Sequence, residues 1–166
     1  AYCDAAASMD CVGFVNINDD MGFKTQTLLP PDVYRKYMFP WYKKLVETVH
    51  KRGKPVVLHS CGNIYAIIDE ILDCGWDAKH SFEDIIMPVW DFKKRYGNRV
   101  AVLGGFDMDK ICRLTEDEVR RHTRFLIDTC APGGGWALGT GNSAANYIPV
   151  KNYLAMLDEG YKYGIY

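Results

Sequence analysis

The sequence predicts an α/β protein with parallel strands, on three observations. Apolar, strand-like stretches alternate with helical patterns five times along the 166 residues, as happens when helices cross over between parallel strands. Stretches such as PVVL and VAVL are apolar without interruption, which is typical of strands buried on both faces. Each strand is followed by a polar segment, in most cases with glycine. The chain fits either a doubly wound open sheet or about five-eighths of a (β/α)8 barrel, which needs about 250 residues.

The first predicted unit is a strand over residues 11–19 and a long helix over 31–53. Pro40 is expected to kink this helix because proline has no amide hydrogen and crowds the preceding turn. Gly53 is a suitable C-terminal stop. Apolar side chains recur at every fourth position and are expected to face the core together: Val33, Tyr37, Trp41, Leu45 and Val49.

The second and third units have the same order. A strand over 55–61 leads into a helix over 64–75, which ends on glycine. A weaker strand over 77–83 precedes a helix over 85–97, and Pro88 lies near its first turn, where proline is tolerated.

The fourth and fifth units complete the pattern. A strand over 99–107 is followed by a helix over 116–130, and Thr115 and Glu118 mark the helix start with capping-box spacing. The last two elements are a strand over 136–142 and a helix over 149–164.

The composition excludes several classes of protein. Charge is balanced, with 20 basic and 21 acidic side chains and no basic tract, which argues against nucleic acid as a partner. No apolar run approaches the roughly 20 residues that span a bilayer, and no signal peptide is visible. The six cysteines are scattered without a CxxC pair, which indicates reduced thiols and a cytoplasmic location. The chain opens on Ala1, as expected if it starts within a longer protein.

His59 and Cys61 stand at the C-terminal end of the strand over 55–61, the end where α/β proteins keep their chemistry. Because strand side chains alternate between faces, both project to the same side. A thiolate and an imidazole suit zinc, although a catalytic zinc usually takes three protein ligands. The alternative is a buried histidine with local hydrogen bonds beside a thiol that acts as a small hydrophobe.

Carboxylates also follow the first and third strands. Asp19 and Asp20 can orient a cationic or hydroxyl-bearing substrate, act as an acid and a base, or complete a metal site. Their alternative role is an ordinary turn before Gly22. His80 and Glu83 end the third strand, where Glu83 is either a general base, a metal ligand or part of a plain loop.

The fourth and fifth strands end on further candidates. Asp107 follows Gly104 and Gly105, which permit the close approach of a ligand or simply a tight turn. Thr140 and Asn142 offer neutral hydrogen bonds to a small-molecule substrate.

Four segments of the chain carry a family resemblance: LLPPDVYRKYMFPWYKKLVETVHKRGKPVVLHSCGN, HSFED, KKRYGNRVAVLGGFD and IPVKNYLAML. Together they resemble the uroporphyrinogen decarboxylase superfamily. This group includes the decarboxylase itself and the zinc-dependent methyltransferases that move methyl groups between corrinoid proteins and thiols. The resemblance implies that residues 1–166 are a single C-terminal portion of such a protein, a partial (β/α)8 barrel that begins at about the fourth strand.

The methyltransferase branch has a His-x-Cys motif that supplies two zinc ligands, and His59 and Cys61 stand in those positions. Zinc in that branch binds the acceptor thiol as a thiolate and lowers its pKa. The resemblance therefore implies zinc, a small-molecule or thiol substrate, and a corrinoid carried by a partner protein. Under this hypothesis Glu83 and Asp107 position or protonate the substrate.

The sequence departs from that branch at the third zinc ligand. The branch has a cysteine near the last strand, where this chain has Thr140 or Asn142. Glu83, Asp107 or Asp20 is left to complete the site, or a residue outside this chain does so.

Two other functions stay open. One is decarboxylation of a porphyrinogen or a related acid, a carboxy-lyase activity. The decarboxylase branch has a histidine in the loop of the last strand, where this chain has Thr140. Only two arginines, Arg99 and Arg113, lie near strand ends or the loops after them, where they could hold the carboxylates of such a substrate. The other is a catalytically silent half-barrel. Its two unpaired strand edges, over 11–19 and 136–142, predict a homo-oligomer.

Overall fold

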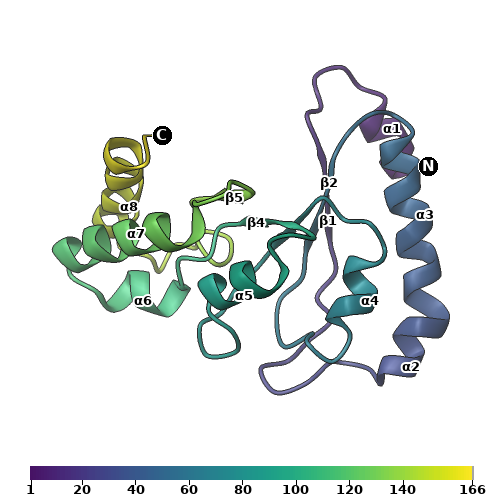
Figure 1. Cartoon of the computed structure of the whole chain (residues 1–166), viewed down its shortest axis with the longest axis horizontal. Helices are drawn as coiled ribbons and strands as arrows, with labels where there is room; N and C mark the ends of the chain where they lie inside the picture. The colour runs from purple at the N-terminus through teal and green to yellow at the C-terminus, as the bar shows by residue number, and fades with distance from the viewer. Residues whose placement is uncertain (166) are drawn as a thin grey trace. The chain divides into compact units, whose positions relative to one another are not determined.

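A computed structural model of the protein describes residues 1–165, which form two compact units (Figure 1). Unit 1 comprises Ala1–His80 with Arg99–Ala101, and unit 2 comprises Ser81–Asn98 with the chain from Val102 onward. Each unit has its own buried core and is described by itself.

Unit 1 is built on parallel strands, as the sequence predicts. Strand β1 (Val15–Asn18) pairs with β2 (Val56–His59), and β2 pairs with β3 (Ala78–His80). The register places Asn18 beside His59 and His59 beside His80. Val56, Val57 and Leu58 are all buried, because both faces of β2 are covered. The pairing therefore brings polar residues from all three strands to one end of the sheet.

Helices α1 (Tyr2–Ala7), α2 (Pro31–Val33), α3 (Phe39–His50) and α4 (Ile68–Leu72) complete unit 1. A π-helical turn, η1 (Tyr34–Met38), joins α2 to α3 directly before Pro40. The amide of Phe39 donates to the carbonyl of Tyr34, five residues back, a widening that accommodates a proline without breaking the helix. The expected disturbance at Pro40 is thus a π turn.

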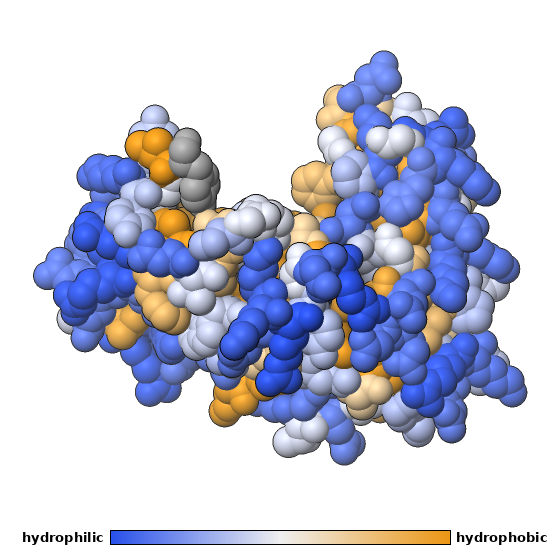
Figure 2. Space-filling view, in the orientation of Figure 1, coloured by the Kyte–Doolittle hydropathy of each residue, from blue (hydrophilic) through white to orange (hydrophobic). Residues whose placement is uncertain are grey.

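The buried face of α3 differs from the predicted one. Tyr37 and Trp41 are 57% and 63% exposed. The buried side chains are instead spaced alternately three and four positions apart, which matches the 3.6 residues of a helical turn. A constant spacing of four positions moves gradually around the helix and leaves the buried face. The buried residues are Phe39, Tyr42, Val46 and Val49. The outer side of α3 carries Lys43, Lys44 and Glu47 and is largely hydrophilic in Figure 2.

Unit 2 pairs β4 (Ala101–Leu103) with β5 (Trp136–Ala137) in parallel, through Val102 with Trp136 and Leu103 with Ala137. Helix α7 packs on α5 and α8, and α6 packs on α8. The helices of unit 2 are α5 (Val89–Tyr96), α6 (Met108–Arg113), α7 (Glu116–Cys130) and α8 (Val150–Tyr163).

The N-terminus of α7 is fixed by hydrogen bonds between residues close together in the sequence. The Thr115 hydroxyl accepts from the Glu118 amide at 3.4 Å, and the Glu118 carboxylate accepts from the Thr115 amide at 2.8 Å. These reciprocal bonds satisfy two amides that the first helical turn leaves without partners, as a capping box does. The predicted helix over 116–130 is confirmed.

The other predicted elements are present but shorter, and two helices were missed. Each observed strand has two to four residues where seven to nine were expected, because the polar ends of the predicted strands already belong to loops. Helix α1 and helix α6 were not predicted. Among the described residues, no helix is long and apolar enough to cross a membrane, and all six cysteines are free thiols.

Candidate metal centre

Residues His59 and Cys61 lie side by side at the end of β2. The Cys61 Sγ atom is 3.4 Å from His59 Nε2. Ser60, between them, points the other way and is buried, and its hydroxyl accepts from the Met21 amide at 3.2 Å. The alternation expected of a strand therefore continues through this segment and directs both soft donors to one side.

Asp20, from the loop after β1, joins these two side chains. Its Oδ1 accepts from the Cys61 amide at 2.9 Å. One donor atom each from Asp20, His59 and Cys61 lie within 4.8 Å of one another, and no other such group of three metal-binding side chains occurs in the described part of the chain.

Asp19 is held differently from its neighbour. The Tyr42 hydroxyl donates to its carboxylate at 2.5 Å. Burial and this hydrogen bond raise the pKa of Tyr42 well above its ordinary value, so the phenol remains a donor. Asp19 thereby ties the end of β1 to α3, and Asp20 is the carboxylate that lies near His59 and Cys61.

Two glycines, Gly22 and Gly62, allow close backbone contact between the loops that follow β1 and β2. Gly62 has φ +80°, and a Cβ added there would collide with the backbone of Gly22. A Cβ added at Gly22 would lie 2.6 Å from the Asn63 amide nitrogen. Because only glycine permits such backbone contact, the loop that carries Asp20 and the loop that carries Cys61 are packed main chain against main chain.

The strand β3 adds two further polar residues. His80 Nδ1 lies 2.7 Å from His59 Nδ1. Lys79 is 3% exposed and its Nζ lies 3.5 Å from the Ser60 carbonyl oxygen. Burial lowers the pKa of Lys79 to about 7, partly offset by the nearby Cys61 thiol. A cationic side chain is thus available behind a potential thiolate.

The geometry of this group fits a zinc ion. Ligand bonds of about 2.3 Å from sulfur and about 2.05 Å from nitrogen in a tetrahedral site separate the two ligand atoms by about 3.5 Å, close to the 3.4 Å between Cys61 Sγ and His59 Nε2. Burial lowers the pKa of His59, which favours the neutral imidazole that binds metals. Sulfur, nitrogen and carboxylate oxygen are all zinc ligands.

Unit 2 contains the remaining predicted site residues. Glu83 lies in the loop after β3, where its carbonyl oxygen accepts from the amides of Ile86 and Met87, each at 3.0 Å. Asp107 is a helix cap: its Oδ1 accepts from the amides of Asp109 and Lys110 at 2.9 and 3.1 Å. Thr140 donates to the Asn142 carbonyl at 2.6 Å within their loop.

Asp84 was missed by the sequence analysis. Its amide donates to Asp107 Oδ2 at 2.9 Å, and Lys110 Nζ lies 2.7 Å from its own Oδ2. Burial raises the pKa of Asp84 although Lys110 opposes the shift. The three residues tie the loop after β3 to the start of α6. Nothing in the sequence distinguishes Asp84 from the neighbouring Glu83.

The chain matches the uroporphyrinogen decarboxylase (URO-D) family over residues 2–163. It belongs to this family. The resemblance inferred from the sequence motifs is therefore confirmed at the level of the family.

Three curated relatives of this URO-D family chain include two methyltransferases. The methylated-thiol–coenzyme M methyltransferase of Methanosarcina mazei is 26% identical over 132 residues, 79% of this chain and 33% of the relative. The methylcobamide:CoM methyltransferase MtaA of Methanosarcina barkeri is 29% identical over 119 residues, 66% of this chain and 33% of the relative. The uroporphyrinogen decarboxylase of Thioalkalivibrio sulfidiphilus is 25% identical over 141 residues, 82% of this chain and 39% of the relative. The chain thus spans between a third and two-fifths of their length.

A solved methyltransferase structure from Methanosarcina mazei has the same fold. It superimposes on 93% of this chain with a TM-score of 0.69 and 19% sequence identity, and this chain covers 43% of it. The predicted architecture of the URO-D family chain, part of a (β/α)8 barrel, is confirmed.

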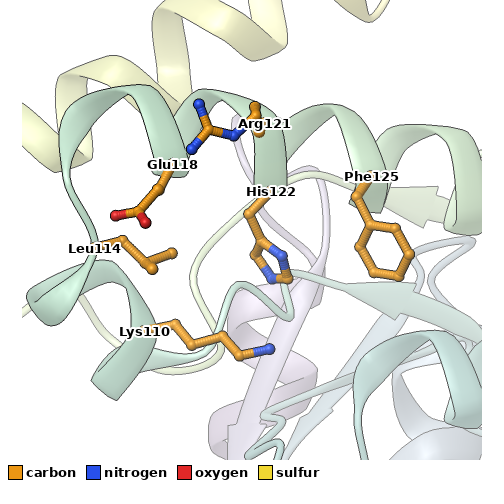
Figure 3. Close-up of a pocket in the computed structure, with 6 residues that line it drawn as sticks. All are labelled: Lys110, Leu114, Glu118, Arg121, His122 and Phe125. Carbon is orange, nitrogen blue, oxygen red and sulfur yellow. The ribbon is translucent and has the colours of Figure 1, made fainter.

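Unit 2 of this URO-D family chain also has a pocket of about 350 Å³ between α6 and α7 (Figure 3). His122 projects from α7 toward Lys110, and its ring packs against Phe106 and Phe125, with centroids 4.8 and 5.6 Å apart. Its buried Nε2 atom has no hydrogen-bond partner among residues 1–165. None of the predicted site residues lines this pocket. The lining residues are Lys110, Leu114, Glu118, Arg121, His122 and Phe125.

This setting of His122 makes stability depend on pH. Burial, and next the charge of Lys110, lower the pKa of His122 to about 4 from its ordinary 6.5. The unfolded chain therefore takes up a proton at a higher pH than the folded chain, and stability falls as the pH drops from 6.5 to 4. Between pH 6.5 and 4 the free energy of unfolding of a His122→Phe variant is expected to fall by about 1–2 kcal/mol less than that of the natural chain, since solvent screens part of the effect.

Chemical denaturation at several pH values measures the effect of His122→Phe. The control is Phe125→Leu, which removes a ring partner of His122 but no titrating group, and should shift stability by a similar amount at every pH. An unchanged pH dependence in His122→Phe would contradict the expectation.

Proposed function

We propose that this chain is part of a zinc-dependent methyltransferase that moves a methyl group between a corrinoid protein and a thiol or another small molecule. The observation that carries the proposal is the grouping of Asp20, His59 and Cys61, whose donor atoms lie within 4.8 Å of one another, with a zinc-like spacing of 3.4 Å between Cys61 Sγ and His59 Nε2. Two relatives, a methylated-thiol–coenzyme M methyltransferase and a methylcobamide:CoM methyltransferase, support the reaction class and a corrinoid partner.

The proposed division of roles follows from the contacts. Asp20, His59 and Cys61 hold the zinc. Bound zinc lowers the pKa of a coordinated thiol and so supplies a thiolate nucleophile at neutral pH. Glu83, in the loop after β3, positions the substrate or exchanges a proton with it.

The other predicted site residues take supporting roles in this proposal. Asp107 fixes the loop that follows β4 through its three amide hydrogen bonds. Thr140 and Asn142, after β5, and His80, at the end of β3, are each assigned a hydrogen bond to a small-molecule substrate. Asp19 supports the end of β1 through its hydrogen bond from Tyr42.

The proposal assigns methyl transfer to the whole protein. Residues 1–166 would form its C-terminal portion, as the order of the family-like segments implies, and the chain covers 33–39% of the length of its curated relatives. By itself this portion is then catalytically silent. The six free thiols are consistent with a cytoplasmic location.

Metal analysis tests the proposal. The chain is purified without added zinc, analysed for bound metal, and analysed again after incubation with zinc and removal of the excess. About one equivalent of zinc is expected in a site with this donor set. Less than about a tenth of an equivalent, with no uptake on incubation, would overturn the proposal.

Decarboxylation is the second candidate, favoured by the likeness to the Thioalkalivibrio sulfidiphilus decarboxylase. It requires cations that hold substrate carboxylates. Arg99, however, is paired with Asp69 and Asp73, and Arg113 with Asp109, so neither is available without losing an ion pair. A turnover assay of the full-length protein with a porphyrinogen and with a methylated corrinoid protein distinguishes the two activities.

Self-association belongs to the same proposal. Strand edges with unpaired backbone groups favour pairing with another chain, and β1 and β5 are the strands for which the sequence predicts such edges. We expect the isolated chain to form a homo-oligomer. Light scattering after size-exclusion chromatography measures its mass, and a monodisperse monomer across the accessible concentration range would contradict this expectation.

A further inference from the structure

We propose that His80 is a positioning residue that fixes the tautomer of His59, so that the lone pair of His59 Nε2 faces the metal-binding group. This inference rests on the proposed function, since it concerns the same zinc site. It adds a fourth residue, His80, which lies outside the group of Asp20, His59 and Cys61.

The distance between the two imidazoles shows how they interact. Their Nδ1 atoms are 2.7 Å apart. Two nitrogens bound to one tetrahedral zinc, each at about 2.05 Å, would be separated by about 3.3 Å. The shorter distance is that of a hydrogen bond, so one Nδ1 carries the proton and the other accepts it.

The other nitrogen of His59 decides the direction of this bond. His59 Nε2 faces Cys61 Sγ at 3.4 Å, and a zinc ligand must present a lone pair there. The proton of a neutral His59 is therefore on Nδ1, which donates to Nδ1 of His80. A metal-binding histidine commonly donates its second N–H in this way, and that hydrogen bond sets its tautomer and ring orientation.

Neighbouring groups make the choice of tautomer matter. Cys61 offers an acceptor atom on the Nε2 side of His59, and Asp20 offers a carboxylate within 4.8 Å of the group. In the absence of metal these acceptors favour a proton on Nε2, which would block ligation. His80 supplies the competing acceptor on the Nδ1 side and keeps the ligating nitrogen unprotonated.

The backbone holds the two rings in place. His59 and His80 are direct partners in the parallel pairing of β2 with β3. The Ser60 amide donates to the His80 carbonyl at 2.8 Å, and the Asp19 amide donates to the His59 carbonyl at 3.0 Å. The ring centroids are 4.8 Å apart with planes inclined at 51°. The hydrogen bond is thus built into the sheet.

Two variants separate positioning from simple packing. His80→Asn keeps an acceptor, because the Asn Oδ1 atom occupies the place of Nδ1, whereas His80→Leu removes it. Long-range ¹H–¹⁵N NMR of the imidazoles in zinc-free protein reports the tautomer of His59, and competition with a chromophoric chelator reports the zinc dissociation constant.

The expected results form a pattern. In the natural chain and in His80→Asn, His59 carries its proton on Nδ1, and their zinc dissociation constants agree within about threefold. In His80→Leu the proton moves to Nε2 and zinc binding weakens by about 10–100-fold, the usual effect of losing such a partner. The control is His50→Leu, which removes a histidine whose Nε2 pairs with Asp77 away from this group, and it should change neither quantity.

The inference and the proposed function fail in different ways. A proton on Nε2 in the natural chain, or an unchanged tautomer and zinc affinity in His80→Leu, would overturn the role of His80. A natural chain that binds no zinc while His59 carries its proton on Nδ1 would overturn the proposed function and leave the hydrogen bond from His59 to His80 established.

Discussion

Replacing Cys61 by serine is expected to weaken zinc binding by at least about a hundredfold. The thiolate is the softest donor of the group, and a serine hydroxyl stays protonated at neutral pH and binds zinc poorly. Losing a partner that only orients a ligand costs about 10–100-fold in affinity, so losing a ligand itself should cost at least the upper end of that range. Chelator competition measures the dissociation constant.

The matched control for Cys61→Ser is Cys112→Ser. Cys112 is also a half-buried free thiol, but it lies in unit 2, where its Sγ is 3.9 Å from the Tyr147 carbonyl. Cys74 and Cys130 are poorer controls, since burial raises the pKa of each thiol to about 11 and keeps both protonated. Equal zinc affinity in the Cys61 and Cys112 variants would refute the assignment of Cys61 as a ligand.

Replacing Lys79 by methionine is expected to stabilise the zinc-free chain by about 2–4 kcal/mol at pH 7. The side chain is almost fully buried, so the ammonium group has lost nearly all of its contact with water, which disfavours its charged form. Methionine keeps an unbranched stem of similar length and removes the charge. The loss of the hydrogen bond to the Ser60 carbonyl offsets part of the gain.

The sign of the pH dependence provides a second measurement for Lys79. Its pKa is about 7 in the folded chain and 10.5 in the ordinary lysine. Unfolding therefore takes up a proton between these values, and the stability of the natural chain should rise over that range as the penalty is relieved. Below pH 7 the penalty is complete.

Denaturation of the zinc-free protein from pH 6 to pH 10 tests this behaviour. The Lys79→Met variant should lack the part of the rise that Lys79 causes, whereas Lys43→Met, at an exposed position on α3, should retain it. Destabilisation by Lys79→Met at every pH would show that the buried ammonium group contributes more through its contacts than it costs through burial.

The fold was predictable where the signal is local. The predicted boundaries of α7 were correct because they depend on a capping box between Thr115 and Glu118, only three positions apart. The prediction of the buried face of α3 was wrong. The π turn at Tyr34–Met38 and the 3.6-residue period of the helix together decide which side chains face β2. The sequence does not predict helix α6, because the helix start depends on Asp107, whose side chain accepts from the amides of Asp109 and Lys110.

The candidate site was predictable in part for the same reason. Alternation along one strand is enough to place His59 beside Cys61. Choosing Asp20 rather than Asp19 requires knowing that Tyr42, 23 residues further on, donates to the latter. The buried state of Lys79 and its position behind Cys61 depend on the pairing of β2 with β3, which no short motif records.

The contact between Gly22 and Gly62 helps to set the distance between the loop that carries Asp20 and the loop that carries Cys61. Because main chain rests directly on main chain there, the gap between positions 20 and 61 does not depend on the thiol of Cys61. The Asp20 carboxylate adds one hydrogen bond, from the Cys61 amide. An exchange of the thiol for another side chain at position 61 is therefore expected to leave the backbone of both loops in place.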